Sequence, residues 1–421
     1  MERYYAQIHQ TVPFDDDKAL NYQNTLRQNI AAMSAPLTRT LPTELRLDNV
    51  KELIRRYTIE PMANYDNMCT ETATDIDMNK KIVDIKAFFA HLDLQLEYIK
   101  SGSTGHAFKA TSRTNRNIQL VVKVAAYQTI GYGGIHNMSR PENAELRMVK
   151  LLSYFVLKKY TPHFVLPLCT SYACIKDFID ITSNVVDIDN PRNSQYKLFL
   201  ERYEAKKFDN LVSVFIGEWC NGGDLIDYLR RNHQSLTLID WQTIMFQILF
   251  TLAMVHQKYP SFRHNDAKGN NMLVNITNDK ALHPNYKNTY KMGRIKFVIP
   301  VSNISIKIWD FDFASIKGII DNDKTDSLWA EKHAIGVEKN RYYDVHYFLN
   351  TLSTFRFFPQ FYQGGAPQEV LDFVHRVVPK QYRKDPRYVS DKGRLLVQHE
   401  YLTPHEIIMK DTFFDAFRFT I

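Results

Sequence analysis

The stretch FRHNDAKGNNMLV, residues 262–274, combines a group of polar side chains with an apolar run. An aspartate, Asp266, stands two residues after a histidine and five residues before an asparagine, Asn271, with Lys268 between them. In such a loop the carboxylate can accept or orient a hydroxyl proton during attack on a phosphoryl group, the lysine can neutralise the phosphate, and the amide can ligate a metal ion. The stretch therefore predicts either a phosphoryl-transfer loop or a polar turn that only looks like one.

The composition limits the classes of protein that the chain can form. Its 421 residues are enough for two or three domains, or for one two-lobed fold with extensions, and a hydrophobic content of 44% argues against wholesale disorder. The net charge of +7 suits an anionic ligand. Since the basic residues are scattered and not striped, we expect no nucleic-acid binding.

The cysteines and the apolar stretches indicate the compartment. The four cysteines form no Cys-x-x-Cys pair and have no histidine cluster nearby, so neither a zinc site nor a disulfide framework is expected, and a reducing, intracellular compartment is favoured. The N-terminus has no apolar segment of a signal peptide. The most apolar stretch, 238–255, is interrupted by polar residues, so we expect a buried helix and no transmembrane segment.

The order of the expected elements predicts an α+β fold with two lobes and a cleft between them. The first part of the chain is polar and partly helical, with candidate helices at 42–59 and 79–92. Strands around a glycine turn, one helix and further strands then form a β-rich block, and a mainly helical block follows a Gly-Gly turn. The expected divisions are an N-terminal extension at 1–92, a β-rich lobe and hinge at 93–220, and a helical lobe at 221–421, with polar insertions at 183–197 and 277–294.

Three helix starts carry clear local signals. Thr237 followed by Asp240 resembles a capping box at the start of the apolar helix. Thr403 with Glu406 three residues later predicts a second capping box for the last helix. Pro141 predicts the start of a helix after the strands.

Further candidate residues lie outside the opening stretch. Gly102 and Gly105 form a turn between two strands whose backbone N–H groups could face a phosphate, although glycine hairpins are common. Lys123 stands in the middle of an apolar strand, where it either faces solvent from an edge or needs a partner; Glu145 on the following helix could be that partner. Asp310 ends an apolar strand and is well placed to bind Mg²⁺.

In this order and on these elements, the motifs together resemble the eukaryotic-type protein kinases. The resemblance runs from about residue 93 to the C-terminus. It rests on IKSGSTGHAFKA (99–110) for the glycine-rich loop, VVKV (121–124) for the strand-3 lysine, HNDAKGNN (264–271) for the His-Arg-Asp loop, DFD (310–312) for the Asp-Phe-Gly motif, YYDVHYFLNTL (342–352) for helix F with Asp344 as its buried aspartate, and TPHEIIMKDTFF (403–414) for the closing helix.

The resemblance implies a bilobal kinase fold that uses ATP and Mg²⁺, with Mn²⁺ as the alternative metal. The implied catalytic residues are Asp266, Lys268, Lys123 and Glu145, and the implied metal ligands are Asn271 and Asp310. The segment FIGEWCNGGDL (215–225) is similar to the hinge, with Gly217 at the gatekeeper position. The implied nucleotide contacts are Gly102, Ser103, Gly105 and Lys123 at the phosphates, Glu218 and Cys220 at the adenine, and Asp224 at the ribose.

A closer resemblance is to the serine/threonine kinases of large cytoplasmic DNA viruses, of the poxvirus virion-assembly type. It rests on WDFDFASIKGII (309–320), NRYYDVHYFLNTL (340–352), the long insertion before the DFD strand, and the N-terminal extension. It implies protein substrates, with virion proteins among the candidates, a location in the host cytoplasm or viral factory, and packaging in the virion. Lys268, two residues after Asp266, matches the serine/threonine pattern and not the tyrosine pattern.

The chain departs from the kinase pattern at several positions. Lys100 replaces the first loop glycine, and Asn265 replaces the arginine that pairs with a phosphorylated activation segment in the family. Asp312 replaces the glycine of the Asp-Phe-Gly motif, where the left-handed backbone suits Gly better than Asp. WAEKHAIG (329–336) is the nearest match to an Ala-Pro-Glu motif and lacks its proline.

Three interpretations of the residues stay open. The first is an active serine/threonine protein kinase, and the second is a pseudokinase that acts as a scaffold. The third is a small-molecule kinase of the aminoglycoside or choline type, which shares the loop pattern; a nucleic-acid-binding or structural protein is a distant fourth. The polar residues that the kinase pattern requires are all present, which argues against a dead enzyme: Lys123, Glu145, Asp266, Asn271 and Asp310. The two-glycine loop, the Gly-Gly-Asp turn and Lys268 favour a protein substrate.

Overall fold

The computed structural model describes residues 78, 80–102, 105–114, 116, 118–276, 287–300 and 302–420. The candidate helix at 42–59 and the loop residue Ser103 lie outside these residues. The described chain forms two compact units. The first unit contains the described residues up to Ile135 together with Pro167–Trp219, and the second contains His136–Leu166 and Cys220–Ile421.

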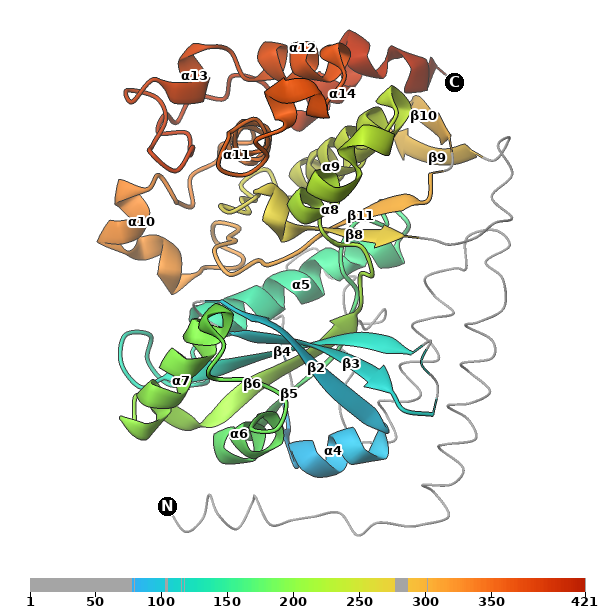
Figure 1. Ribbon diagram of the computed structural model, residues 1–421. Coiled ribbons are helices and arrows are strands. Elements are labelled where there is room, and N and C mark those ends of the chain that lie inside the picture. The colour runs from blue at the N-terminus through green and yellow to red at the C-terminus, as the bar shows by residue number, and fades with distance from the viewer. Residues whose placement is uncertain are drawn as a thin grey trace. The chain divides into compact units, whose positions relative to one another are not determined.

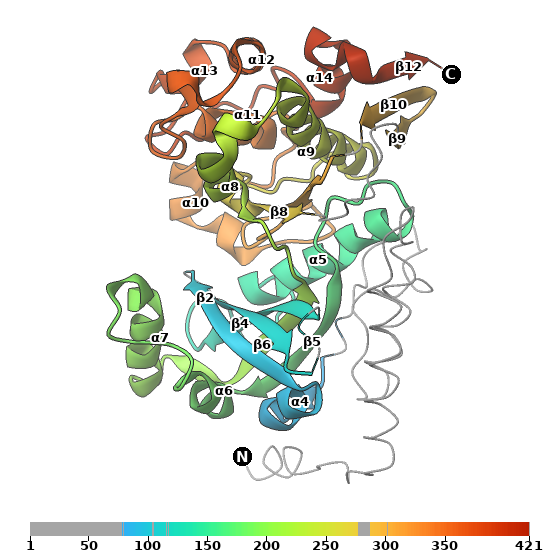
Figure 2. The ribbon, with the colours of Figure 1, turned by 45° about the vertical axis from the view of Figure 1, so that its right-hand side comes forward.

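The first unit is a six-stranded sheet with helices on one face (Figures 1 and 2). Its spatial order is β1-β5-β6-β4-β3-β2, and all neighbours are antiparallel except the short pair β1 and β5. The strands are β1 (Ile82–Val83), β2 (Leu94–Ser101), β3 (His106–Ser112), β4 (Gln119–Gln128), β5 (Pro167–Cys174) and β6 (Phe208–Glu218), and the helices are α4 (Ile85–His91), α6 (Ile175–Thr182), α7 (Ser194–Glu204) and the short turn η2 (Pro191–Asn193).

The core of the first unit lies between the sheet and these helices. Side chains alternate along a strand, so one set on β3 and β4 faces the helices while the other set faces away. The buried set packs against aromatic and aliphatic residues of α4, α6 and α7; it includes Phe108, Ala110, Val122 and Val124 from the strands and Ile85, Phe88, Phe178, Tyr196 and Phe199 from the helices. The opposite face carries Ala107, Lys109 and Lys123.

The second unit is mainly helical and contains two small sheets whose strands carry buried side chains. β7 and β11 flank β8 in one three-stranded sheet, and β9 and β12 flank β10 in another. Its helices are α5 (Pro141–Leu157), α8 (Leu225–Asn232), α9 (Leu238–Lys258), α10 (Leu328–Lys332), α11 (Tyr343–Leu352), α12 (Gln368–Val377), α13 (Gln381–Lys384) and α14 (Pro404–Lys410), with short turns η3 (His233–Ser235), η4 (Gly269–Asn271), η5 (Asp323–Asp326), η6 (Phe361–Gly365) and η7 (Thr412–Phe417). Its strands are β7 (Gly223–Asp224), β8 (Met272–Ile276), β9 (Lys287–Met292), β10 (Ile295–Pro300), β11 (Ile304–Ile308) and β12 (Arg418–Thr420).

Helix α9 runs through the middle of the second unit (Figure 1). Its capping box is formed as expected: the Thr237 side chain accepts from the Asp240 backbone, and the Asp240 carboxylate accepts from the Thr237 backbone. Among the described helices α9 has the length and apolar composition to cross a membrane, but 78% of that apolar window is buried inside the protein. The helix is therefore packed as a core helix.

The structure agrees with several local expectations and adds elements that the sequence did not indicate. The capping box of Thr403 with Glu406 is formed, and Pro141 opens α5. The polar insertion at 183–197 contains the start of α7, and the described part of the 277–294 insertion is strand β9, which pairs with β10. Helix α4 occupies only 85–91 of the candidate helix at 79–92, because residues 82–83 form β1.

Candidate functional site

The loop that contains Asp266 is a compact hydrogen-bonded unit. Lys268 donates from Nζ to Asp266 Oδ2 at 2.7 Å, and Asn271 donates from Nδ2 to the same oxygen at 2.9 Å and to the Asp266 backbone carbonyl at 2.8 Å. The residues that follow Lys268 form the turn η4, after which β8 begins at Met272. Three of the predicted site residues therefore meet at one carboxylate, and the Asp266 side chain is 9% exposed.

Helix α11 holds the backbone of this loop through the buried Asp344. Its two carboxylate oxygens accept from the backbone N–H groups of His264 at 2.7 Å and Asn265 at 2.9 Å. Burial raises the pKa of Asp344, whereas His264 and the charge of Arg263 act in the opposite direction. His264 continues the network: its Nε2 donates to the Trp309 carbonyl at 3.0 Å, and its Nδ1 accepts from the Asp266 backbone at 3.3 Å.

The two candidate metal ligands lie at adjacent ends of paired strands. β8 and β11 are antiparallel with Met272 opposite Ile308, and the Trp309 backbone N–H donates to the Asn271 carbonyl at 3.0 Å. Asn271 precedes β8 and Asp310 follows β11, so the strand pairing itself places them side by side. Because Asn271 donates its Nδ2 to Asp266, its Oδ1 is the atom that faces away as an acceptor.

These residues fit a magnesium ion. Mg²⁺ prefers oxygen ligands and is commonly held by one or two carboxylates together with phosphate oxygens, so one carboxylate from Asp310 and one amide oxygen from Asn271 are a suitable donor set. Within the described ranges no three His, Cys, Asp or Glu side chains form a metal cluster, and this donor set needs none. The backbone of Asp310 is left-handed, with φ of 66°.

The left-handed backbone is not at the position where the sequence suggested it. Asp312, which replaces the motif glycine, is absent from the described residues with positive φ, whereas Asn265 (φ 63°) and Asp310 are present. Asn and Asp accept this conformation more readily than other non-glycine residues. The Asp312 carboxylate instead forms a close ion pair with Lys324.

The segment between Asp310 and Asp344 is held by side chains of the second unit. Asn265 donates from Nδ2 to the carbonyls of Phe313 at 2.9 Å and Gly336 at 3.0 Å, so it joins the two ends of the segment. Asn322, which is buried, donates to the carbonyls of Asp312 and Ala314 at 3.0 and 3.1 Å.

Arginines add to this order without a phosphate. Arg263 donates to the Ala334 carbonyl at 3.0 Å and stacks on Tyr343 with 3.8 Å between its guanidinium carbon and the ring centroid. Arg147 of α5 donates to the Ile319 carbonyl at 3.1 Å. Burial lowers the pKa of both guanidinium groups, and for Arg147 the charge of Asp321 in the segment acts in the opposite direction.

We expect catalysis that does not require phosphorylation of this segment. Its only Ser and Thr residues are Ser315 and Thr325, both buried, and Ser327, which is exposed. Asn265 cannot form a bidentate, charge-assisted contact with a phosphate, and its amide already holds the segment. The initial rate on an external substrate after phosphatase treatment and removal of the phosphatase should stay within about twofold of the untreated rate.

Ser327→Ala provides the matched control for this expectation. It should retain the parent rate before and after preincubation with ATP, because a phosphate at this exposed position has no described arginine partner in the segment network. Lys317 and Lys324, the nearby lysines, are in ion pairs with Glu338 and Asp312. The expectation would be overturned if phosphatase treatment caused a large rate loss that preincubation with ATP restored in the parent chain but not in Ser327→Ala.

In the first unit the turn that contains Gly102 and Gly105 packs against the side chain of Lys123. Gly102 donates its backbone N–H to the Gly105 carbonyl at 2.8 Å, which closes the turn. A Cβ atom on Gly105 would lie 3.1 Å from the Val124 carbonyl oxygen and 3.3 Å from Cε of Lys123. The close approach explains why a glycine stands at position 105, and it brings two of the predicted nucleotide contacts together.

Lys123 is in the middle of the sheet and not at an edge. It pairs with Ala107 of β3 on one side and with Phe215 of β6 on the other. Its side chain is partly buried, whereas Glu145 lies buried on α5 in the second unit. The edge-strand explanation for this lysine is therefore wrong, and its pairing with Glu145 stays a prediction.

The remaining predicted nucleotide contacts follow one another along the chain from the end of β6. Glu218 is the last residue of β6 and pairs with Leu120, and Cys220 is buried at the start of the second unit. Asp224 caps α8, since its Oδ1 accepts from the Asp227 backbone at 3.0 Å, and Asn270 of the loop that contains Asp266 donates to the same oxygen at 3.3 Å. The sequence did not indicate this capping role.

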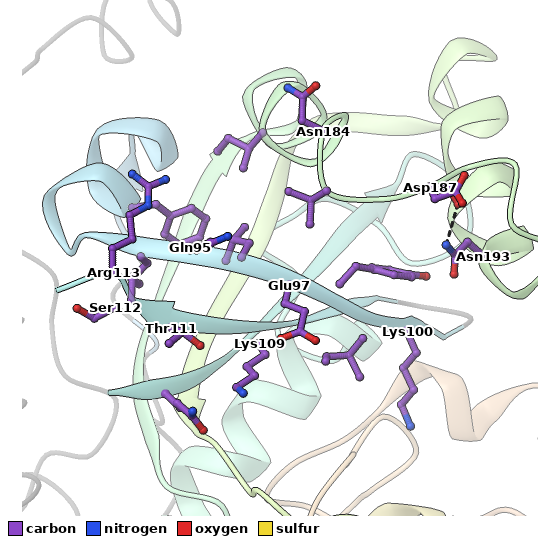
Figure 3. A pocket seen from close by; sticks show the side chains of 18 of the residues that line it. Gln95, Glu97, Lys100, Lys109, Thr111, Ser112, Arg113, Asn184, Asp187 and Asn193 are labelled. Atoms are coloured by element: carbon purple, nitrogen blue, oxygen red, sulfur yellow. Dashed lines mark hydrogen bonds between the residues drawn. The ribbon is translucent and has the colours of Figure 1, made fainter. Parts of the chain in front are cut away.

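An open groove follows the edge strand β2 of the first unit (Figure 3). Glu97 and Lys109, which are register partners on β2 and β3, line it together with Lys100 and Thr111. Gly102, Gly105 and Lys123 are not among its lining residues, but Lys100 and Ser101, which directly precede Gly102, are.

The structure places one further residue, Arg394, in contact with the loop that contains Asp266. It lies between α13 and α14 and is 4% exposed, and its Nη2 forms a close ion pair with Asp266 Oδ1. Burial acts to lower the pKa of this guanidinium, but Tyr343, Tyr347 and Asp266 raise it, and the net shift is upward. No motif around Arg394 marks it in the sequence, because the contact joins residues 128 positions apart.

Comparison with known proteins gives a consistent result. The family model described as poxvirus serine/threonine protein kinase matches residues 135–413. The chain is 48% identical over 408 residues to a protein of Acanthamoeba polyphaga mimivirus named as a candidate serine/threonine-protein kinase, with 96% of this chain and 87% of the relative covered. A second mimivirus protein with the same kind of name is 24% identical over 338 residues, with 70% of this chain and 83% of the relative covered.

Proposed function

The chain belongs to the poxvirus serine/threonine protein kinase family, and from this premise we propose that it transfers the γ-phosphoryl group of ATP to Ser or Thr hydroxyls of protein substrates. The observation that carries the proposal is the convergence of Lys268 and Asn271 on the Asp266 carboxylate, beside the strand end that carries Asp310. The kinase class follows from the family; the nucleotide, the metal and the residue roles are our proposals.

The residues of the second unit have distinct roles in the proposed reaction. The Asp266 carboxylate accepts a hydrogen bond from the substrate hydroxyl and so orients its oxygen towards the phosphorus; it takes up the hydroxyl proton as the new O–P bond forms and ADP leaves. Lys268, 2.7 Å from that carboxylate and 28% exposed, offsets negative charge on the transferring group. When bound, ATP would supply the phosphoryl group and Mg²⁺ would offset the negative charge of its oxygens. Asp310 and the Asn271 amide oxygen would hold the metal, with Mn²⁺ as an alternative.

The residues of the first unit serve the nucleotide in this proposal. The backbone of the Gly102–Gly105 turn approaches the phosphates, and Lys123 beneath it contributes an ammonium group with Glu145 as its orienting partner. Glu218 and Cys220 offer backbone groups to the adenine, and Asp224 meets the ribose. The relatives are viral proteins, so we place the enzyme in the host cytoplasm or viral factory, with virion proteins as candidate substrates and packaging in the virion as a further proposal.

One incubation separates the proposed activity from the alternatives. The purified chain is given labelled ATP and Mg²⁺ with casein, with no added substrate, and with small alcohols in turn. Label on serine or threonine of casein or of the chain supports the proposal, label on the alcohols alone would assign a small-molecule kinase, and no label on any of them would assign a scaffold.

We expect Mg²⁺-dependent thermal protection by ATP. A ligand that binds only the folded state stabilises it by about 2.7 kcal/mol at a hundredfold excess over Kd. The chain should melt at a higher temperature with ATP and Mg²⁺ than with ATP and EDTA, as measured by differential scanning fluorimetry. Asp310→Asn should lose the metal-dependent part of this shift, because it removes the carboxylate next to Asn271. Equal melting of the parent chain under both conditions would favour the scaffold.

A further inference from the structure

Arg394 makes three directed contacts around the catalytic aspartate. Its Nη2 bonds to Asp266 Oδ1, and its Nη1 donates to the Asn265 carbonyl and to the Tyr343 hydroxyl, the last at 3.3 Å. The guanidinium carbon lies 4.3 Å from the centroid of the Tyr347 ring. One planar group therefore contacts the side chain of the catalytic residue, the peptide bond before it, and the helix below it.

The guanidinium approaches the loop from the protein interior. Tyr343 and Tyr347 belong to α11, whose Asp344 holds the same loop from below, and both tyrosines are buried. The Arg394 side chain is 5% exposed and the Asp266 side chain 9%. Because the arginine sits on the buried side, it supports the carboxylate without occupying the solvent side from which a substrate hydroxyl arrives.

The backbone that carries Arg394 is itself fixed. Arg394 donates its N–H to Ser390 Oγ at 3.0 Å and accepts from the Ser390 N–H at 2.9 Å, which closes a tight turn. Gly393 in this turn has φ of 82°, and its carbonyl accepts from Asn350 Nδ2 of α11 at 3.0 Å. The turn and the catalytic loop are therefore anchored on the same helix.

The two oxygens of Asp266 are divided between different donors. Oδ2 accepts from Lys268 and Asn271, which belong to the loop itself, whereas Oδ1 accepts from Arg394, which comes from outside the loop. We propose that Arg394 is a positioning residue of the phosphotransfer site, which fixes the rotation of the Asp266 carboxylate and the backbone before it. The proposal rests on the proposed function, since it acts through the catalytic role of Asp266.

A simple counter-ion would not need this geometry. A buried arginine requires a negative partner, and Asp266 supplies one. Only a planar fork can bond to a carboxylate oxygen and a backbone carbonyl in two fixed directions, and a lysine would retain the charge without the fork. Asn265 has lost the arginine of the family pattern, and Arg394 brings a guanidinium to the same peptide from a distant part of the chain.

Two substitutions test the proposal in the full-length chain. Arg394→Lys keeps the buried charge and Arg394→Ala leaves a cavity; we expect kcat to fall about tenfold in the first and about a hundredfold in the second. KM for ATP should stay within about twofold in both, because no nucleotide contact is removed. Guanidinium ion at low millimolar concentration should partly restore the Arg394→Ala rate, and methylammonium at the same ionic strength should not.

Arg341→Met is the matched control, because it loosens the same segment without touching Asp266. Arg341 holds Glu400, a few residues after Arg394, through paired contacts at 2.7 to 3.2 Å. It should lower the melting temperature and leave kcat within about twofold of the parent. If Arg394→Ala does not fold, Arg394→Lys with its retained charge still decides the outcome.

The outcomes also separate this inference from the proposed function. A parent chain that phosphorylates casein, an inactive Asp266→Asn variant and Arg394→Lys at the parent kcat would overturn the positioning role and leave the proposed function intact. The positioning role would also be overturned if Arg341→Met lowered kcat as much as Arg394→Lys does at an equal drop in melting temperature. An active Asp266→Asn variant would instead remove the proposed function.

Discussion

Replacing Asp266 with asparagine is expected to lower the rate of phosphoryl transfer by about a thousandfold or more, which corresponds to about 4 kcal/mol of lost transition-state stabilisation. The amide cannot take up a hydroxyl proton and carries no charge to orient the substrate. If its oxygen faces Arg394, its NH₂ group meets the donors of Lys268 and Asn271, so the loop also loses hydrogen bonds. Turnover of labelled ATP on casein measures the loss.

The control for this prediction is Asp227→Asn. Asp227 is an exposed aspartate that pairs with Arg230 at 3.0 Å on α8, so the same chemical change is made away from the loop. It should keep the parent rate. The Asp266→Asn chain should still melt cooperatively and still be protected by Mg²⁺ and ATP, because Asp344 continues to hold the loop backbone. Near-normal turnover with intact folding would show that the site assignment is wrong.

Features with a local signal could be predicted from the sequence. The two capping boxes, Thr237 with Asp240 and Thr403 with Glu406, follow from residues three positions apart and are formed in the structure. The strand that carries Lys123 and the strand that precedes Asp310 follow from short apolar runs. The α+β class and the kinase family follow from the order of these elements, because each motif is weak alone and their sequence order is specific.

Features that depend on distant contacts could not be predicted. The layer of α4, α6 and α7 over one sheet face includes part of a polar insertion, and α7 buries only Tyr196 and Phe199, too few to show a clear helical pattern. Arg394 has no local motif at all. The motif pattern predicts left-handed backbone at the glycine position, Asp312, whereas the structure has it at Asp310.

Contacts between distant residues also bear on the departure of the Asp266 loop from the kinase pattern at Asn265. Three residues make contacts in this region, where the family has an arginine at the position of Asn265. Asn265 and Arg263 donate to backbone carbonyls of the segment after Asp310, and Arg394 donates to the Asn265 carbonyl in the loop. In the family, a phosphate and one arginine hold the segment in place. Here buried side chains hold the segment and the loop through hydrogen bonds to backbone carbonyls. A position-by-position comparison of motifs overlooks such compensation, because the replacing residues stand elsewhere in the chain.

Replacing Lys123 with methionine is expected to reduce phosphoryl transfer by about a hundredfold or more, since an ammonium group held at a phosphate stabilises charge that develops in the transition state. Methionine keeps the length of the side chain and its contact with the glycine turn, where Cε of Lys123 lies 3.3 Å from the Cβ position of Gly105. The strand pairs with Ala107 and Phe215 involve the backbone and are retained. The fold should therefore persist while the rate collapses.

Lys109→Met separates the loss of this particular ammonium from the loss of any positive charge. Lys109 lies two residues after Ala107, so it is on the same face of the sheet as Lys123, but it stacks over Trp219 with 5.5 Å to the ring centroid and stands opposite Glu97. We expect Lys109→Met to keep kcat within about twofold of the parent. Equal losses in the two variants would point to the general charge of the sheet face, and undiminished turnover in Lys123→Met would remove this lysine from the site, because a methionine has no group that could take over its charge.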